Sequence, residues 1–411
     1  MHRLVSCSKT VLAGVAALAA LASLETAHAG ITILYAFTGG SDGANPYAGV
    51  IEDKAGNLYG TTYQGGIECY SEQSCGTVFK LAPDGAETVL HAFTGGKSDG
   101  ALPDAGLIAD SAGNLYGTTM FGGAYRDGTV FKLAPDGKVT VLHAFTDENG
   151  DGGEPEASLI QDKAGDLYGT TSSGGARGFG TVYKLAPDGA ETVLYDFRYG
   201  RDGAIPLAGL IKDRAGNLYG TTAQGGDNRC RGYSGSGCGT VFKFASDGTE
   251  TTLYAFHGRT HNGASPIAGL VADQAGNLYG TTVIGGRGCE PEPVCGTVFK
   301  LSPDGTETTL YAFRGHKDGD GAHPFASLIE DAAGNLYGTT YKDGTNGHFG
   351  TVFKLAPDGT ETVLYSFDGA DGAFPGAGLI EGKEGDLYGT TSAGGSTACD
   401  GGCGTVFMLK K

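Results

Sequence analysis

Residues of two kinds alternate along short segments of the chain, with the period of a β-strand. Between Glu87 and Phe93, the residues Val89, His91 and Phe93 alternate with Thr88, Leu90 and Ala92. A period of two places successive side chains on opposite faces of a sheet. The pattern therefore predicts a strand in this segment.

Turn-forming residues separate this segment from three similar ones. The four β-prone segments of the first unit are Ala48 to Asp53, Asn57 to Thr62, Gly76 to Leu81 and Glu87 to Phe93. Lys-Ala-Gly at 54–56 joins the first two, and Pro-Asp-Gly at 83–85 joins the last two. Gly accepts positive φ and Pro presets a turn, so both pairs are predicted to be hairpins. Gly60 lies in the middle of the second strand, where we expect close approach of a neighbouring backbone.

The same unit recurs through the chain. Its most constant stretch, Gly-Asn-Leu-Tyr-Gly-Thr-Thr with Asn sometimes replaced by Asp, begins at Gly56, Gly113, Gly165, Gly216, Gly276, Gly334 and Gly385. Successive copies start 51 to 60 residues apart, a period typical of propellers and solenoids. Four antiparallel strands used seven times predict an all-β fold, a seven-bladed β-propeller.

The two ends of the repeat region are complementary parts of one blade. The segment Ile31 to Phe37 matches the fourth strand of other units, such as Glu307 to Phe313. The segment Gly404 to Leu409 matches the third strand, and the last unit has no fourth strand of its own. We expect the N-terminal strand to close the last blade, which leaves no sheet edge open there.

The residues before the repeats have the features of a secretory signal peptide. A positively charged start precedes the apolar run Val11 to Leu24, and Ala27 and Ala29 are the small residues that a signal peptidase reads. We predict a signal peptide over 1–29 and a single domain over 30–411. A membrane anchor is the alternative, but the apolar run is shorter than the about 20 residues that span a bilayer.

Eight cysteines follow this segment in close pairs, each between a Thr-Thr and the next Gly-Thr-Val. The pairs are Cys69 with Cys75, Cys230 with Cys238, Cys289 with Cys295, and Cys399 with Cys403. Three units lack both cysteines. Because each unit has either both cysteines or neither, and the protein is expected to be exported, the pattern predicts four local disulfides. Zinc is the alternative, but each loop offers only two of the four ligands of a tetrahedral site.

Composition narrows the range of partners. A formal net charge of −18 argues against a nucleic-acid partner and favours solubility in an exported protein. The 75 glycines occupy fixed points of the strand-and-turn pattern, which argues against disorder. No later apolar run is long enough to span a membrane. We expect a secreted or periplasmic monomer without a membrane span.

The repeat also resembles a known family. The run from Gly350 to Phe367, Gly-Thr-Val-Phe-Lys-Leu-Ala-Pro-Asp-Gly-Thr-Glu-Thr-Val-Leu-Tyr-Ser-Phe, is similar to the tandem repeat of the GloVer (Gloeobacter and Verrucomicrobia) repeat proteins. The resemblance implies a bacterial exported repeat protein, in a group with varied C-terminal surface anchors. The last residues, 408–411, carry no apolar tail, which favours release. The family implies no activity for particular residues.

Strand direction places the loops on two opposite faces. The Ala-Gly-Asn and Pro-Asp-Gly turns hardly vary and form what we call the turn face. The loops with the cysteines and the connections between blades vary in length and form the variable-loop face. A rigid scaffold with variable loops on one face is a common layout for binding or catalysis, so we expect the functional site on the variable-loop face.

A motif Asp-Gly-Ala-x-Pro connects the blades. It begins at Asp42, Asp99, Asp202, Asp320 and Asp371, with variants at Asp151 and Asn262. A ring of acids around a pore could bind cations or a basic ligand. Because the motif recurs in nearly every blade, we favour the interpretation that Asp caps a turn while Gly and Pro set the backbone.

Two further groups are candidates for metal or acid–base chemistry. Asp147, Asn149 and Asp151 resemble the start of a calcium loop, although Ser158 stands where an EF-hand has Glu. Calcium is thus the one candidate cofactor. Five loop histidines of the fourth to sixth blades could bind a ligand, a metal or protons: His257, His261, His316, His323 and His348. Scattered surface histidines are the alternative.

His91 and His143 occupy a strand position held elsewhere by Tyr254 or Tyr311, so we expect both to be packing residues. No nucleophile elbow, phosphate loop, dinucleotide fingerprint or His-Glu-x-x-His motif is present. The sequence favours a non-catalytic scaffold that binds a carbohydrate or protein ligand on the variable-loop face. A polysaccharide lyase or hydrolase using acids and histidines there, and a structural cell-envelope protein, are alternatives, because fold alone does not decide.

Overall fold

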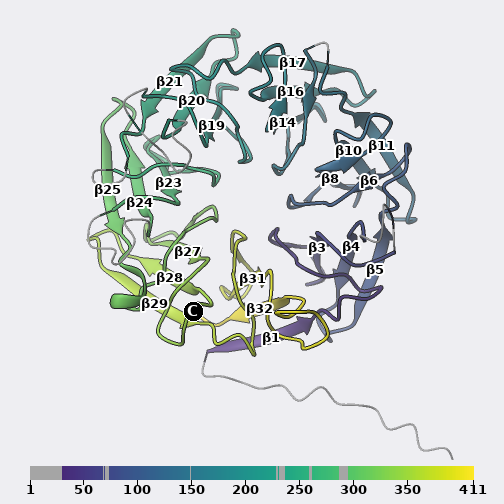
Figure 1. Cartoon of the computed structure of the whole chain (residues 1–411), viewed down its shortest axis with the longest axis vertical. Helices are drawn as coiled ribbons and strands as arrows, with labels where there is room; N and C mark the ends of the chain where they lie inside the picture. The colour runs from purple at the N-terminus through teal and green to yellow at the C-terminus, as the bar shows by residue number, and fades with distance from the viewer. Residues whose placement is uncertain are drawn as a thin grey trace, which may run out of the picture.

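Seven four-stranded antiparallel sheets surround a common axis in the computed structural model, as Figure 1 shows. The structure describes residues 30–67, 69, 74–148, 150–227, 230, 237–258, 262–286 and 295–411. Each sheet is one blade, with its first strand nearest the axis and its fourth at the periphery. The predicted all-β, seven-bladed β-propeller is confirmed.

The two inner strands of every blade form a hairpin that ends on the turn face. The first strands are β2 (Ile51–Glu52), β7 (Ile108–Ala109), β13 (Ile160–Gln161), β18 (Ile211–Lys212), β22 (Val271–Ala272), β26 (Ile329–Glu330) and β30 (Ile380–Glu381). The second strands are β3 (Leu58–Thr62), β8 (Leu115–Thr119), β14 (Leu167–Thr171), β19 (Leu218–Thr222), β23 (Leu278–Thr282), β27 (Leu336–Thr340) and β31 (Leu387–Thr391).

The two outer strands form a second hairpin in six blades. The third strands are β4 (Thr77–Leu81), β10 (Thr129–Leu133), β16 (Thr181–Leu185), β20 (Thr240–Phe244), β24 (Thr297–Leu301), β28 (Thr351–Leu355) and β32 (Thr405–Leu409). The fourth strands are β5 (Glu87–Ala92), β11 (Val139–Ala144), β17 (Glu191–Asp196), β21 (Glu250–Ala255), β25 (Glu307–Ala312), β29 (Glu361–Ser366) and β1 (Ile31–Ala36).

Short elements lie in the connections on the variable-loop face. Strand β6 (Gly100–Ala101) pairs with β9 (Phe121–Gly122), and β12 (Gly152–Gly153) pairs with β15 (Ser173–Gly174). A single 3-10 turn, η1 (Gly315–Lys317), lies between the fifth and sixth blades. Among the described residues, no helix has the length and apolar character needed to cross a membrane.

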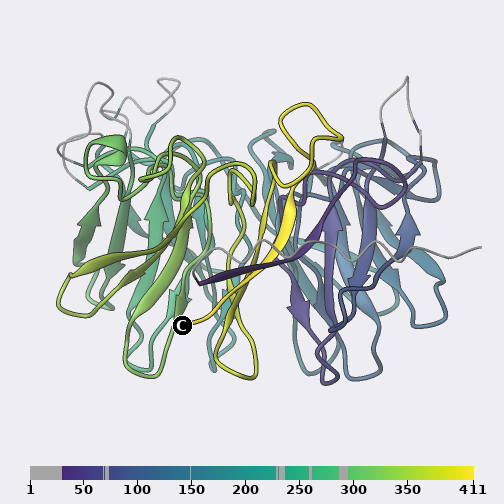
Figure 2. The same cartoon turned by 90° about the horizontal axis from the view of Figure 1, so that it is seen from below.

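The N-terminal strand closes the ring, as predicted. Strand β1 pairs antiparallel with β32, with Ile31 opposite Leu409 and Ala36 opposite Thr405. Figure 2 shows these two strands, in purple and yellow, lying side by side although they come from opposite ends of the chain. The first and last blades are thereby joined by backbone hydrogen bonds.

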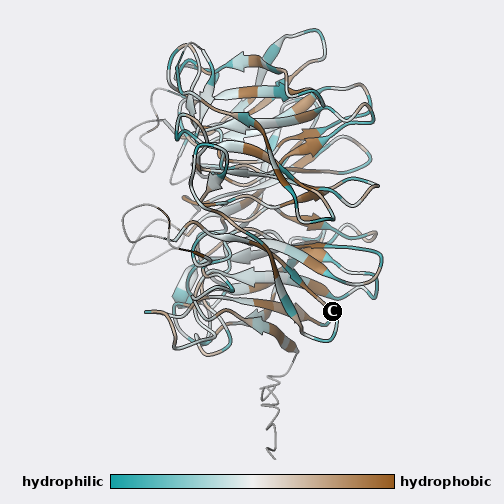
Figure 3. Cartoon of the chain, turned by 90° about the vertical axis from the view of Figure 1, so that its right-hand side faces the viewer, coloured by the Kyte–Doolittle hydropathy of each residue, from teal (hydrophilic) through white to brown (hydrophobic). Residues whose placement is uncertain are grey.

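The hydrophobic core is divided into layers between neighbouring blades. Figure 3 shows hydrophobic stretches along the strands, whereas several turn tips are hydrophilic. The fully buried Phe79 of β4 packs edge-on against Phe37 of the preceding connection, with ring centroids 5.2 Å apart. Equivalent aromatic pairs recur at the other six blade interfaces. The mid-strand Gly60 faces this ring, since a Cβ there would lie 2.7 Å from Cζ of Phe79.

The expectation for Gly60 was therefore wrong about its neighbour. The glycine makes room for an aromatic ring of its own blade, directly opposite in the register, and not for the backbone of another blade. The first strand of the blade is also shorter than predicted. Only Ile51–Glu52 pairs as a strand within the predicted segment from Ala48 to Asp53, because the carbonyl of Ala48 accepts a hydrogen bond from Thr390 of the neighbouring blade.

The two threonines of the constant stretch hold the ring together. The first donates its hydroxyl to an Ala carbonyl of the next blade, as Thr61 does to Ala105 at 3.1 Å. The second bonds the Thr hydroxyl of the adjacent strand, as Thr62 does with Thr77 at 2.8 Å. Both bonds occur in all seven blades. The repeated stretch is thus explained by blade assembly.

Candidate functional site: the mouth of the central channel

Seven positions that differ between blades gather around the axis on the variable-loop face. In each connection one variable residue follows the Pro of Asp-Gly-Ala-x-Pro and precedes a constant Ala and a Gly or Ser. We call these the mouth residues: Tyr47, Asp104, Glu156, Leu207, Ile267, Phe325 and Gly376. Together with the two residues after each, they line a hollow of about 140 Å³.

A narrow ring of small residues forms the inner wall of this hollow. A Cβ on Gly49 would lie 2.6 Å from the carbonyl oxygen of Gly378 in the neighbouring blade. The amide of Gly106 donates to Oγ of Ser158 at 3.0 Å, and Gly269 is bonded in the same way. Adjacent blades therefore touch here, which explains why only Gly or Ser follows the constant Ala.

The residue before the Pro of each connection has a positive φ, between 52° and 58°, in all seven blades. These residues are Asn45, Leu102, Glu154, Ile205, Ser265, His323 and Phe374. This region is uncommon for residues other than Gly and is a true outlier for branched or bulky ones. Each such residue costs about 1–3 kcal/mol unless its surroundings hold it.

Backbone hydrogen bonds on both sides hold this conformation. The amide of Asn45 donates to the carbonyl of Cys403 in the preceding blade at 2.8 Å, and its carbonyl accepts from the amide of Tyr63 at 3.0 Å. The same two bonds occur at each of the other six positions. The backbone that carries the mouth residues is thus fixed by its own blade and by the previous one.

The acidic side of the mouth comes from the second and third blades. Burial raises the pKa of Asp104 to about 7, and the neighbouring Glu156 adds to the shift. Burial also raises the pKa of Glu156, although a hydrogen bond of 2.7 Å from Ser172 opposes that rise. Within the described part of the chain, no side chain or amide donates to the carboxylate of Asp104.

The aromatic side of the mouth comes from the sixth and first blades, on either side of Gly376 of the seventh. Phe325 packs edge-on against Tyr341 at 4.9 Å, and Tyr47 packs edge-on against Tyr63 at 5.3 Å. The ring of Tyr341 lies where Gly376 lacks a side chain, 3.6 Å from the place of its Cβ. Burial raises the pKa of Tyr47, and Tyr341 is the next cause, which places these two rings near each other. Tyr47 keeps 37% of its surface exposed.

The predicted histidine group is divided among separate places. His257 pairs with Asp227 at 3.0 Å, and His323 lies over Phe325 beside the mouth. His316 and His348 do contact each other, with ring centroids 5.2 Å apart. His348 also pairs with Asp343, at 2.6 Å, and His261 lies outside the described residues. His257 lies in the connection between the fourth and fifth blades, His316 and His323 lie in the next connection, and His348 lies between β27 and β28.

The calcium-loop candidate is only partly described, because Asn149 lies outside the described residues. Asp151 uses its carboxylate in the turn, where it accepts from the amides of Thr146 and Gly152 at 3.0 and 2.8 Å. Asp147 lies near Asp127, whose pKa is raised by burial and then by these neighbouring acids. In the described ranges, no three His, Cys, Asp or Glu residues are arranged to hold a metal ion.

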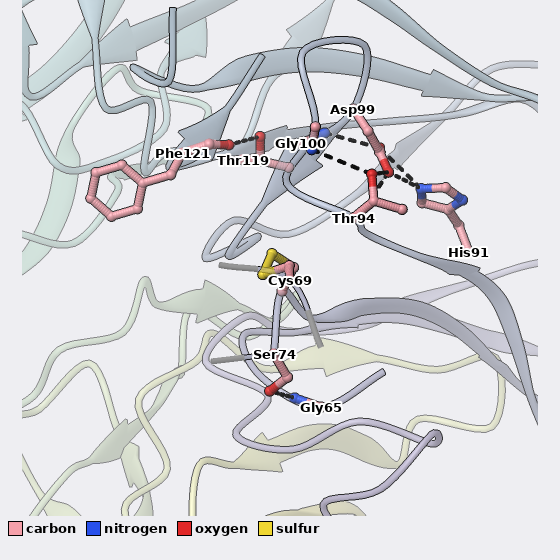
Figure 4. Close-up of a disulfide and its surroundings, with 11 residues drawn as sticks. Gly65, Cys69, Ser74, His91, Thr94, Asp99, Gly100, Thr119 and Phe121 are labelled. Carbon is pink, nitrogen blue, oxygen red and sulfur yellow. Dashed lines mark hydrogen bonds and ion pairs between the residues drawn. A yellow bond between two sulfur atoms is a disulfide. The ribbon is translucent and has the colours of Figure 1, made fainter. Parts of the chain in front are cut away.

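The acids of Asp-Gly-Ala-x-Pro cap turns, as favoured from the sequence. Asp99 accepts from the amides of Thr94 and Gly100, both at 2.9 Å, and from His91 at 3.1 Å (Figure 4). At all seven positions the Asp or Asn accepts from the amide that follows the buried Phe of the preceding blade, or from one nearby in that turn.

The two strand histidines are packing residues, as predicted. His91 packs edge-on against Phe93 at 4.8 Å, and His143 packs in the same way against Phe145.

The disulfide-bonded cysteines are hydrogen-bonded to the backbone that carries the mouth residues. Cys69 is bonded to Cys75, Cys230 to Cys238 and Cys399 to Cys403, as predicted, and Figure 4 shows the first of these. Cys295 is disulfide-bonded too, and Cys289 lies outside the described residues. The carbonyl of the second cysteine in each pair accepts the amide of the positive-φ residue in the next blade. The cysteines thereby anchor four of the seven strained positions.

Sequence reasoning did not find the mouth residues. One signal was available: within Ala-x-Pro-X-Ala-Gly, the positions x and X vary from blade to blade while their neighbours stay constant. A variable position inside a constant frame indicates a side chain that the fold does not need. Its place beside the axis becomes clear only once the blades form a ring.

Comparison with solved structures finds likenesses at low sequence identity. The extracellular domain ascribed to a one component system of B. thetaiotaomicron is 10% identical, with a TM-score of 0.55, over 93% of this chain and 40% of that one. A gluconolactonase from Xanthomonas campestris is 16% identical, with a TM-score of 0.42, over 73% of this chain and 82% of that one. These likenesses concern the fold alone.

A protein from Thermus thermophilus, named as an oxidoreductase (glucose dehydrogenase), is 16% identical, with a TM-score of 0.44, over 75% of this chain and 96% of that one. Comparison with curated proteins finds no match. The model of the Gloeobacter/Verrucomicrobia repeat matches residues 10–233, 67–289 and 230–407. Because these overlapping matches span nearly the whole chain, the protein belongs to the Gloeobacter/Verrucomicrobia repeat family.

Proposed function

We propose that this protein is a non-catalytic binding scaffold that takes a carbohydrate or protein ligand at the channel mouth on its variable-loop face. One observation carries the proposal. The seven blades repeat the same structural bonds, yet the seven mouth residues around one hollow differ in charge, size and polarity. Concave sites with several aromatic and a few polar groups are the usual form of a ligand site.

We also propose that the protein is exported. The N-terminal segment 1–29 has the charge, apolar run and small residues of a signal peptide. Disulfides in the loops of the variable-loop face suit an oxidising compartment, outside the cell or in the periplasm. Cell fractionation with detection of the mature N-terminus would check both points, with cleavage after Ala29 as the expected result.

The binding test compares two variants on the same face. Purified protein of residues 30–411 is titrated with a panel of bacterial and plant polysaccharides and with proteins of the same cell envelope. We expect saturable binding that Tyr47→Ala combined with Tyr341→Ala weakens by about tenfold or more, since aromatic contacts dominate such sites. Tyr125→Ala is the control, because Tyr125 is 61% exposed but does not line the hollow. Equal binding by all three proteins would place the ligand elsewhere.

A polysaccharide hydrolase or lyase is the second candidate. The observation in its favour is the carboxyl pair Asp104 and Glu156, because two acids with different surroundings can divide acid and base roles. Incubation with the same polysaccharides, followed by mass spectrometry of the soluble fraction, separates the two functions. We expect no new oligosaccharides, and products that disappear in Asp104→Asn would replace binding with catalysis.

A further inference from the structure

The mouth residues are sorted by type around the ring. In blade order, an aromatic arc runs from Phe325 of the sixth blade past Gly376 of the seventh to Tyr47 of the first. An acid pair follows in the second and third blades, and Leu207 and Ile267 complete the circle. Among the described residues that line the hollow there is no Lys, Arg or His. The hollow therefore contains negative charge, and the side chains lining it supply no positive charge to balance it.

Asp104 is the residue that makes this imbalance acute. Its side chain is partly buried and lines the hollow. Other enclosed acids on the same face are satisfied, as Asp99 is by Thr94, Gly100 and His91. In the described structure Asp104 has no such donor. A buried carboxylate that lacks both donor and counter-charge is costly, and a cationic ligand would relieve that cost.

The aromatic rings beside the acids suit the same kind of ligand. Burial raises the pKa of Tyr63, with Asp104 as the next cause, so this ring and the carboxylate are neighbours. Tyr47 packs against Tyr63 and is more than one-third exposed. Ring faces attract cations through their quadrupole. An ammonium group in the hollow would contact both an ionised acid and an aromatic ring.

We propose that the channel mouth binds the ammonium group of an amino sugar. The inference rests on the proposed binding function and specifies its ligand. The acid pair recognises the positive charge, while the arc from Phe325 through Tyr341 to Tyr47 covers the apolar face of the sugar ring. A lysine side chain would satisfy the acids, but its thin chain would leave most of the arc uncovered.

The protonation of the acids sets the expected pH dependence. The titratable groups that face Asp104 are Glu156, Tyr47 and Tyr63, and Glu154 faces Glu156; none of these is a cation. An acid that holds its proton near neutral pH must release it before it can pair with an ammonium group. Affinity should therefore increase when the pH is raised from 5.5 to 7, while a neutral sugar should show little change.

Calorimetric titration with two matched trisaccharides tests the proposal. Both have the same β-linked backbone, and they differ only in that one carries free amines from glucosamine and the other carries N-acetyl groups. We expect the amine trimer to bind about tenfold or more tightly at pH 7, with an advantage that shrinks at pH 5.5 and in added salt. Equal affinity of the two trimers would overturn the proposal, and so would tighter binding of a trilysine peptide.

Paired variants assign the charge effect to the mouth. Asp104→Asn with Glu156→Gln should remove the preference for the amine trimer. Asp136→Asn with Asp188→Asn is the matched control: it removes two acids from exposed turns of the same two blades, and each Asn can still accept the turn hydrogen bond. A preference that survives in the mouth variant would overturn the proposal, as would displacement of the amine by an equal concentration of calcium.

The outcomes also separate this inference from the function beneath it. If neutral polysaccharides bind at the mouth and lose affinity in Tyr47→Ala with Tyr341→Ala, but amines gain nothing, the amino-sugar assignment fails and the binding function stands. If neither trimer, nor any polysaccharide or protein of the panel, binds, both fail together. Thermal unfolding of each variant shows whether a lost preference comes from a lost fold.

Discussion

Aspartates occur both on the turn face and at the channel mouth, but their hydrogen bonding differs. In the second blade, Asp110 on the turn face accepts from the amides of Ala112 and Asn114, the amide side chain of Asn114 and the hydroxyl of Tyr116, at 2.7 to 3.0 Å. Asp104, in the connection that leads into that hairpin, has none of these donors. Burial alone would raise both pKa values, yet hydrogen bonds bring that of Asp110 below its ordinary value.

The difference shows how this repeat separates structure from site. On the turn face an Asp of the inner hairpin accepts hydrogen bonds within that hairpin in six blades, so the residues recur from blade to blade. At the mouth the fold fixes the backbone but gives the side chains no common partner: Glu156 accepts from Ser172, whereas Asp104 has no donor among the described residues. Positions without an internal partner are free to differ, and seven of them around one axis can together form a surface that no single unit contains.

The largest expected difference in stability is between a variant of a core aromatic residue and a variant of a mouth aromatic residue. Phe131→Ala should destabilise the protein by about 3–5 kcal/mol, because the ring is fully buried between two blades. Phe325→Ala should cost much less, since Phe325 is only partly buried beside the hollow. Urea unfolding of both variants checks the contrast. Similar losses would mean that the mouth aromatics are core residues.

Much of the architecture could be predicted from the sequence, because it depends on residues that every unit repeats. The seven blades and the closing strand β1 follow from such positions, and the disulfides in the described loops follow from cysteine pairs that a unit has together or not at all. The first strand was predicted too long, because Ala48 bonds to a neighbouring blade and not within its own sheet. The partner of Gly60 was wrong because a glycine shows only that space is needed, not what fills it.

The site was harder to predict, because it is formed by closure of the ring. Tyr47 and Tyr341 lie in the first and sixth blades, and no local pattern connects them. The histidines were grouped by blade order, but order around the ring does not fix how far each loop extends from it. His323 reached the mouth, whereas His316 and His348 met each other at a different place.

The second effect compares the two acids of the second blade directly. Asp110→Ala should destabilise the protein by about 2 kcal/mol, because four donors lose their acceptor. Asp104→Asn should leave stability unchanged or raise it slightly at pH 8, because it removes an unpaired buried charge. Chemical unfolding at pH 8 measures both. A substantial loss in Asp104→Asn would reveal a structural partner for this carboxylate and weaken the case for a ligand.

The smallest expected effect on stability per residue is a pH dependence, which is set by the acids whose pKa is raised. Burial, followed by a nearby Asp in each case, raises the pKa of Glu87, Glu191 and Glu361 to about 7, as burial does for Asp104. Their stabilising contribution is complete below the ordinary value of 4.5 and is lost as the pH rises through about 7. The free energy of unfolding should therefore fall between pH 5 and pH 8, by on the order of 1 kcal/mol for each such group, and the melting temperature should fall with it.

The turn-face acids affect stability in a different pH range. Hydrogen bonds, chiefly from Asn335, overcome the effect of burial and lower the pKa of Asp331 to about 2. Its contribution is lost only as the pH falls below the ordinary value of 3.8, so it does not oppose the trend above pH 5. Glu191→Gln should flatten the pH dependence of the melting temperature, whereas Asp136→Asn in an exposed turn should not. A melting temperature that rises towards pH 8 would show that these acids gain partners when ionised, and the contrast between a satisfied turn face and unsatisfied acids elsewhere would not hold.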